Sequence, residues 1–104
     1  MRVALYQCHP LPLDVAGNLQ RLKTIASQSQ NVDLLVLPEM FLTGYNIGAQ
    51  AVAELAQTRD GAAAQQIAEL AKATGMAIAY GYPERDAGGH IYNSVQVIDS
   101  HGKS

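Results

Sequence analysis

The chain has 104 residues, of which 48% are hydrophobic and 15% are charged, and its formal charge is −2. This is the size and composition of one small globular domain, or of part of a larger one, without the basic surface that binds nucleic acid. The single cysteine, Cys8, excludes an internal disulfide, and no cysteine or histidine spacing is typical of a zinc site. No segment has the pattern of a signal peptide or the length of a membrane span. We therefore expect a cytoplasmic protein with no cofactor, no metal, and neither a nucleic-acid nor a membrane partner.

The first half of the chain predicts two β-α units. Residues 3–8 have the composition of a strand, and Asp14 stands where the N-cap of a helix is expected. Residues 32–37 are apolar almost without alternation, which is typical of a strand covered on both faces. A short helix is expected over 49–57. Apolar residues recur at helical spacing after Asp14, at Val15, Leu19, Leu22 and either Ile25 or Ala26.

The second half predicts one further helix and a β-hairpin. The helix spans 62–74 and ends at Gly75, which is a residue type that commonly terminates helices. A strand over 76–82, a turn over 86–89 and a strand over 91–98 follow, and the two strands should pair antiparallel. The element order predicts an α/β fold with a mixed sheet and helices on one face. The strands offer apolar side chains to both faces, so the other face requires cover from elsewhere.

Glu39 is the first candidate functional residue. It follows the apolar strand directly, and Pro38, which lacks an N–H group, ends the strand's hydrogen-bond ladder just before it. A carboxylate fixed by a stiff element among apolar neighbours is suited to proton transfer. The alternative is a glutamate in water at the rim of the sheet.

Residues 37–45, Leu-Pro-Glu-Met-Phe-Leu-Thr-Gly-Tyr, resemble the first catalytic segment of the nitrilase, or carbon–nitrogen hydrolase, superfamily. Similar segments occur in that family's order and spacing over essentially the whole chain. The resemblance implies an α-β-β-α sandwich. It also implies that residues 1–104 form the N-terminal part of a single hydrolase domain, truncated before the catalytic lysine and cysteine. The other matching segments are 3–7, Asn18-Leu19, Tyr92-Asn93-Ser94-Val95 and 98–103.

The resemblance further implies a cysteine, glutamate and lysine triad that hydrolyses a non-peptide C–N bond, of an amide more than of a nitrile. Only Glu39 matches the triad here, as the general base that takes the thiol proton and later activates water. Lys103 lies in the turn that precedes the expected lysine, so we do not assign it to the triad. We expect the 104-residue stretch alone to be inactive. Family resemblance also implies a small-molecule amide or nitrile substrate and a homodimer or larger homo-oligomer.

Other side chains receive lesser roles. Tyr45 is a candidate for the substrate pocket, and Asn93 is expected to be a buried polar residue that ties backbone groups together near the site. Cys8 is interpreted as a small core hydrophobe, and Glu84 as part of a solvated turn. The three histidines are expected in solvent, at positions His9, His90 and His101.

Two other functional classes compete with a hydrolase. A dinucleotide-binding domain shares the β-α-β order, but the loop over 9–12, His-Pro-Leu-Pro, lacks the glycines that let a backbone approach phosphate. A non-catalytic binding or assembly module is the alternative if the chain truly ends at Ser104, because an uncovered sheet face without a nucleophile favours binding.

Overall fold

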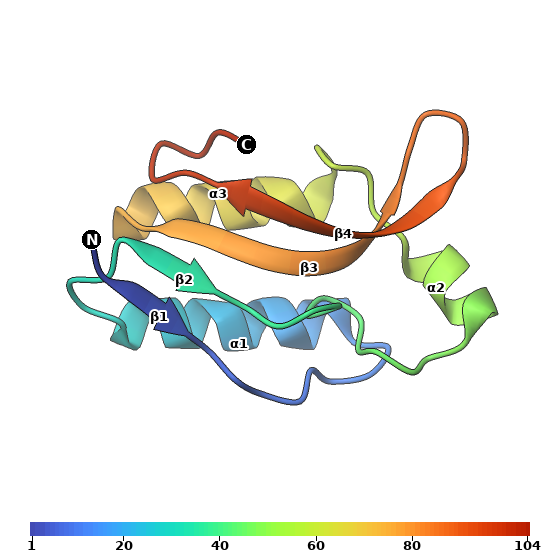
Figure 1. Ribbon diagram of the computed structural model, residues 1–104, viewed down its shortest axis with the longest axis horizontal. Coiled ribbons are helices and arrows are strands. Elements are labelled where there is room, and N and C mark those ends of the chain that lie inside the picture. Colours follow the sequence, from blue (N-terminus) through green and yellow to red (C-terminus); the bar gives the residue numbers. More distant parts are fainter.

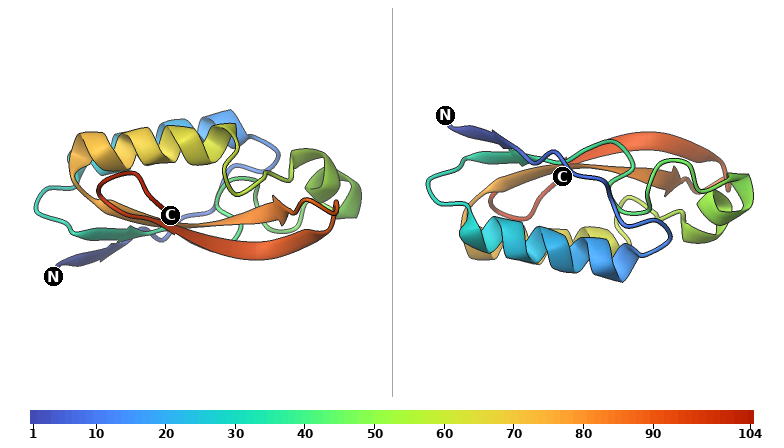
Figure 2. Two further views of the ribbon diagram at one scale, coloured as in Figure 1. Left: turned by 90° about the horizontal axis from the view of Figure 1, so that it is seen from above. Right: turned by 90° about the horizontal axis from the view of Figure 1, so that it is seen from below.

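A computed structural model describes all 104 residues. It consists of one four-stranded sheet, two long helices against one face of that sheet, and a short helix beyond one end of it (Figures 1 and 2). None of the three helices has the length and apolarity needed to cross a membrane. In chain order the elements are β1 (Val3–Leu5), α1 (Val15–Gln28), β2 (Leu34–Val36), α2 (Ala49–Leu55), α3 (Ala62–Thr74), β3 (Ala77–Arg85) and β4 (Ile91–Ile98).

The sheet is mixed, as the element order predicts. Its strands lie in the order β1-β2-β3-β4, with β1, β2 and β3 parallel and β4 antiparallel to β3. Parallel neighbours require a crossover connection, which the helical segments provide, whereas β3 and β4 are joined by a tight turn. Both α1 and α3 lie on the same side of the sheet (Figure 2). The predicted one-sided helical layer is therefore confirmed.

Local capping fixes the start of α1 and the end of α3 where the sequence predicts. The Asp14 carboxylate accepts a hydrogen bond of 2.8 Å from the Gly17 N–H and so caps the start of α1. Gly75 ends α3 in the left-handed conformation, with φ of 68°, and its N–H donates to the Ala71 carbonyl.

The hydrophobic core fills the space between the two long helices and the sheet. Side chains alternate along a strand, so Ile78 and Tyr80 of β3 face the helices while Ala79 and Gly81 face the opposite side. The core cluster has 15 buried residues: Leu19, Leu22, Ala26, Leu35, Leu37, Phe41, Leu42, Ala63, Ile67, Ala71, Met76, Ile78, Tyr80, Tyr82 and Ile98.

The opposite face of the sheet carries apolar side chains that these 104 residues do not cover. Leu5 and Val95 are each 68% exposed, and Val3 and Val97 are also exposed. In β2, Leu35 is buried on the helical side, but Leu34 and Val36, which face the other side, are only half-buried. The expectation that this strand is covered on both faces is therefore not met within the chain. We call this surface the open face.

Four predicted elements have other bounds in the structure, and one of these differences changes an interpretation. β2 spans only Leu34–Val36, within the predicted 32–37. β1 ends at Leu5, after which only the Tyr6 N–H continues the ladder, to the Val36 carbonyl. β3 continues to Arg85, because β4 pairs with it residue by residue and Gln57 forms a bridge to Glu84 on its other side. That same bridge ends α2 at Leu55 instead of at Gln57. Glu84 is therefore a half-buried strand residue and not part of a solvated turn.

Candidate active site

Glu39 lies at the carboxyl end of β2, on the open side of the sheet. The Leu37 N–H donates to the Ala79 carbonyl at 2.8 Å, and the ladder then ends because Pro38 has no N–H. The backbone of residues 38–40 then lies against β3 at Gly81, because a Cβ atom on Gly81 would point directly at it. Since Gly81 shares its side of β3 with Ala79, this contact lies on the face opposite to the helices.

A tight turn follows Glu39 and holds it in place. Met40 has a left-handed backbone, with φ of 52°, which is uncommon for a residue other than glycine. The Thr43 and Gly44 N–H groups both donate to the Met40 carbonyl, at 3.2 and 2.9 Å, and the Leu42 N–H donates to the Gly81 carbonyl at 3.3 Å. The turn is thus bonded both to itself and to β3.

The Glu39 carboxylate has a partner on β4. The Asn93 side-chain amide donates a hydrogen bond from Nδ2 to Oε1 of Glu39, across 54 positions of sequence. Asn93 is opposite Pro83 in the β3–β4 register and shares the open side of β4 with Val95 and Val97. The predicted neighbourhood of Asn93 and Glu39 is present. Asn93 was expected to be buried and to bond to backbone groups, and both expectations are wrong within this chain: its side chain is exposed, as is that of Glu39, and its amide bonds to a carboxylate. Both side chains lie on a face that the 104 residues leave uncovered.

Asn18 is a structural residue of the site to which sequence reasoning gave no role. It is fully buried on α1, donates from Nδ2 to the carbonyls of Leu11 and Leu42 at 2.8 and 3.0 Å, and accepts from the Leu11 N–H at 2.7 Å. It therefore joins the loop before α1 to the turn after Glu39. The signal for it was a polar residue within the apolar stripe, three positions after Val15 and four before Leu22.

Of the lesser candidates, Asn93 alone makes a hydrogen bond to Glu39. Tyr45 is 61% exposed, and its place in a substrate pocket stays a prediction. Cys8 is half-buried and packs against the core cluster, in agreement with its interpretation as a small hydrophobe. Lys103 lies in the turn after β4, where its N–H donates to the Asp99 carboxylate at 3.0 Å. Asp99 follows the end of β4 and is six residues beyond Asn93, or roughly 20 Å along an extended chain. All three histidines are exposed, at His9, His90 and His101.

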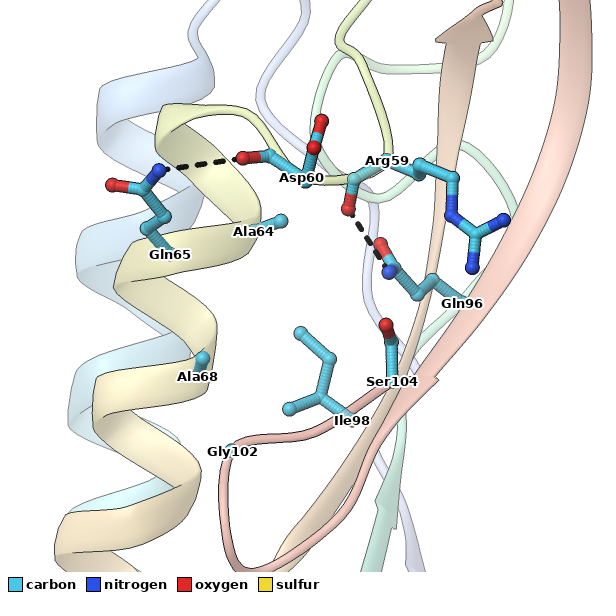
Figure 3. Close-up of a pocket in the computed structure, with 9 residues that line it drawn as sticks. All are labelled: Arg59, Asp60, Ala64, Gln65, Ala68, Gln96, Ile98, Gly102 and Ser104. Atoms are coloured by element: carbon cyan, nitrogen blue, oxygen red, sulfur yellow. Dashed lines mark hydrogen bonds between the residues drawn. The ribbon is translucent and has the colours of Figure 1, made fainter.

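A separate polar network lies on the helical side of the sheet. The Tyr80 hydroxyl donates to Oε1 of Gln96 at 2.6 Å. Nε2 of Gln96 in turn donates to the Arg59 carbonyl at 3.0 Å, a bond that Figure 3 shows. Burial raises the pKa of the Tyr80 phenol above its usual value, and burial together with the charge of Glu84 raises the pKa of Tyr82 to about 12.

The same region contains a cavity of about 310 Å³ between α3 and β4 (Figure 3). Neither Glu39 nor Asn93 lines it, so it is not part of the candidate site. The residues around it are Arg59, Asp60, Ala64, Gln65, Ala68, Gln96, Ile98, Gly102 and Ser104.

Comparison with known proteins connects this geometry to one family. The family described as Carbon-nitrogen hydrolase matches residues 2–104 of the chain. The chain belongs to this carbon–nitrogen hydrolase family. The family resemblance inferred from the segment around Glu39 is thereby confirmed over nearly the whole length.

Three proteins illustrate the relationship. The chain is 64% identical over 103 residues to a Pseudomonas protegens protein named "Hydrolase in pqqF 5′region", and 33% identical over 106 residues to a nitrilase of Pyrococcus abyssi. A solved structure of the amidase from Nesterenkonia sp. AN1 aligns with a TM-score of 0.84 at 28% identity. That structure is a double mutant, with one glutamate and one cysteine replaced, in complex with acrylamide.

These matches cover nearly all of this chain but less than half of each relative. They cover 99%, 98% and 99% of this chain, but only 36%, 40% and 40% of the respective relatives. The chain thus has the fold of the matching portion of a nitrilase-superfamily amidase and spans well under half the length of these relatives. This confirms the predicted fold class.

Proposed function

We propose that residues 1–104 are the N-terminal part of a single carbon–nitrogen hydrolase domain, and that Glu39 is the general base of its reaction. The observation that carries the proposal is the placement of the Glu39 carboxylate, held by Asn93 at the carboxyl end of a parallel strand. A general base must have a fixed orientation toward the proton it takes, and the stiff strand, the bonded turn and the Asn93 amide supply that orientation.

The proposed reaction converts an amide to a carboxylic acid and ammonia through a thioester. Glu39 takes the proton of a cysteine thiol, and the thiolate sulfur attacks the amide carbon to form a tetrahedral intermediate. A lysine ammonium stabilises the oxyanion. The C–N bond then breaks, and Glu39 returns its proton to the departing ammonia. In the second half Glu39 takes a proton from water, whose oxygen attacks the thioester, and the thiol is regenerated. The cysteine and lysine would come from residues after Ser104, so we expect the 104 residues alone to be inactive.

An amide is the substrate class that the comparisons favour. The structurally aligned Nesterenkonia protein is an amidase with acrylamide bound, and the mutant solved in that complex lacks one glutamate and one cysteine. A nitrile is the second candidate, because the Pyrococcus abyssi relative is named a nitrilase. Both substrates release ammonia on complete hydrolysis, so one assay serves for both.

The test is ammonia release by the natural full-length protein and by its Glu39→Gln variant, on a panel of small amides and nitriles. Removing a general base lowers kcat by about 10²- to 10⁴-fold, while the fold should be retained because Glu39 is exposed. Glu84→Gln on β3 is the matched control and should keep its activity. Ammonia release by Glu39→Gln within a few-fold of wild type would overturn the assignment.

The intact mass of the natural protein separates this proposal from the alternative of a binding module. A mass well above 11.1 kDa leaves room for the cysteine and lysine. A mass of 11.1 kDa, with no ammonia released from any substrate, would favour binding or assembly instead of hydrolysis.

A further inference from the structure

Gly81 is an interior residue of β3 that has no side chain to pack. It lies inside β3, pairs with Val95, and is buried, and glycine in a strand interior weakens the strand unless another group needs the space. Its backbone lies outside the left-handed region, so conformational freedom does not explain the residue. The explanation lies instead in what passes over it.

The backbone of the Glu39 segment occupies the space that a side chain at position 81 would take. A Cβ atom placed on Gly81 would lie 2.6 Å from the Met40 nitrogen, 2.8 Å from the Glu39 Cα and 2.9 Å from the Pro38 oxygen. All three are main-chain atoms, which cannot rotate away as a flexible side chain can. The Leu42 N–H also donates to the Gly81 carbonyl at 3.3 Å, so the segment is bonded to the residue on which it rests.

We infer that Gly81 is a positioning residue for Glu39: by lacking a side chain, it lets the Glu39 backbone lie directly on β3, so that the carboxylate reaches Asn93 on the neighbouring strand. Asn93 is two residues from Val95, the β4 partner of Gly81, which places the support and the hydrogen-bond donor side by side. The importance of this placement for catalysis rests on the proposed function, whereas the placement itself does not.

A methyl group added at position 81 should displace the turn that carries Glu39 more than it displaces β3. At its carboxyl end β3 is paired with β4 on one side, and Gln57 bridges to it on the other, so the strand is less free to move than the turn. Extending the shortest contact from 2.6 Å to an ordinary 3.4 Å requires a shift of roughly 0.8 Å at Glu39 and Met40. A misplacement of about 1 Å can cost a catalytic group about 10²-fold in rate.

The experiment measures Gly81→Ala in the natural full-length protein by NMR and by kinetics. With asparagine labelled by ¹⁵N, the side-chain NH₂ signal of Asn93 is assigned from its loss in Asn93→Ser, and its position without a Glu39 partner is taken from Glu39→Ala. Gly81→Ala is expected to move this signal toward its position in Glu39→Ala. We also expect kcat to fall about 100-fold with KM within a few-fold of wild type, because the change misplaces a reacting group and leaves substrate binding in place.

Gly89→Ala is the matched control. It removes a glycine from the same hairpin and imposes a left-handed conformation on alanine, with φ of 82°, but no atom lies within 4 Å of the added Cβ. It should lower stability and leave both the Asn93 signal and kcat at wild-type values. A folded Gly81→Ala protein with the wild-type Asn93 signal would overturn the inference.

A second variant covers the case in which Gly81→Ala does not fold. Adding Met40→Gly relieves the left-handed constraint on Met40 and gives the turn freedom to lift from β3. The double variant should fold with a displaced Asn93 signal, while Met40→Gly alone keeps the wild-type signal. An undisplaced signal in the double variant would refute the inference. Because the NMR result does not depend on hydrolysis, it tests the role of Gly81 even if Glu39→Gln proves active.

Discussion

Replacing Asn18 by alanine should destabilise the protein more than any other single polar substitution on α1. The side chain is fully buried and makes three hydrogen bonds, all to backbone groups of other segments. Alanine leaves the N–H and carbonyl of Leu11 and the carbonyl of Leu42 without these partners. A lost hydrogen bond costs about 1 kcal/mol on average, and more where the abandoned group stays dry.

The expected loss follows from these three bonds. Three bonds at about 1 kcal/mol each give roughly 3 kcal/mol, and the better helix propensity of alanine offsets about 0.5 kcal/mol of it. We therefore expect the free energy of unfolding to fall by about 2–4 kcal/mol. Asn18→Asp should cost at least as much at neutral pH, because a carboxylate keeps the acceptor for the Leu11 N–H but faces the two carbonyls without a proton to donate.

Urea unfolding of the natural full-length protein, followed by far-UV circular dichroism, measures the effect. The midpoint should fall while the slope with denaturant stays constant, since the same surface is exposed on unfolding. Gln20→Ala, on the exposed side of the same helix, is the control and should lie within about 0.5 kcal/mol of wild type. A loss below 1 kcal/mol for Asn18→Ala would show that the Leu11 loop and the Glu39 turn do not depend on this residue.

Two further predictions concern stability. Asp14→Ala removes the cap on the Gly17 N–H and should lower the free energy of unfolding, measured in urea, by about 1 kcal/mol. Asp14→Ser should recover most of this loss, because serine is also a good N-cap. Equal losses in both variants would contradict the capping role. Raising the pH from 10 toward 12 should lower the melting temperature. In the folded protein, burial raises the pKa of Tyr82 to about 12 and also raises the pKa of Tyr80. Tyrosines of the unfolded chain, by contrast, lose their protons near pH 10. The unfolded state then binds fewer protons than the folded state, so stability falls with pH. Tyr82→Phe should weaken this alkaline decline, and an unchanged decline in both Tyr82→Phe and Tyr80→Phe would refute the explanation.

The two long helices were predictable because their determinants are local. The α3 boundaries at Ala62 and Thr74 follow from apolar spacing and from Gly75, and both act within a few residues of the element that they define. The start of α1 follows in the same way from Asp14. β3 was harder to delimit, because its last three residues are held by pairing with β4 across the hairpin and by a bridge from Glu84 to Gln57, which lies far away in sequence.

The sequence by itself determined the element order, the mixed sheet with helices on one face, and Glu39 as the carboxylate that follows the apolar strand. Only the tertiary structure decided how that carboxylate is held. Asn93 lies 54 positions from Glu39, Leu42 lies 24 positions from Asn18, and the space above Gly81 is set by a segment that leaves a different strand. Hydrogen bonds between distant segments and close backbone contacts arise from the packing of strands against one another, and no local pattern of residue types encodes them.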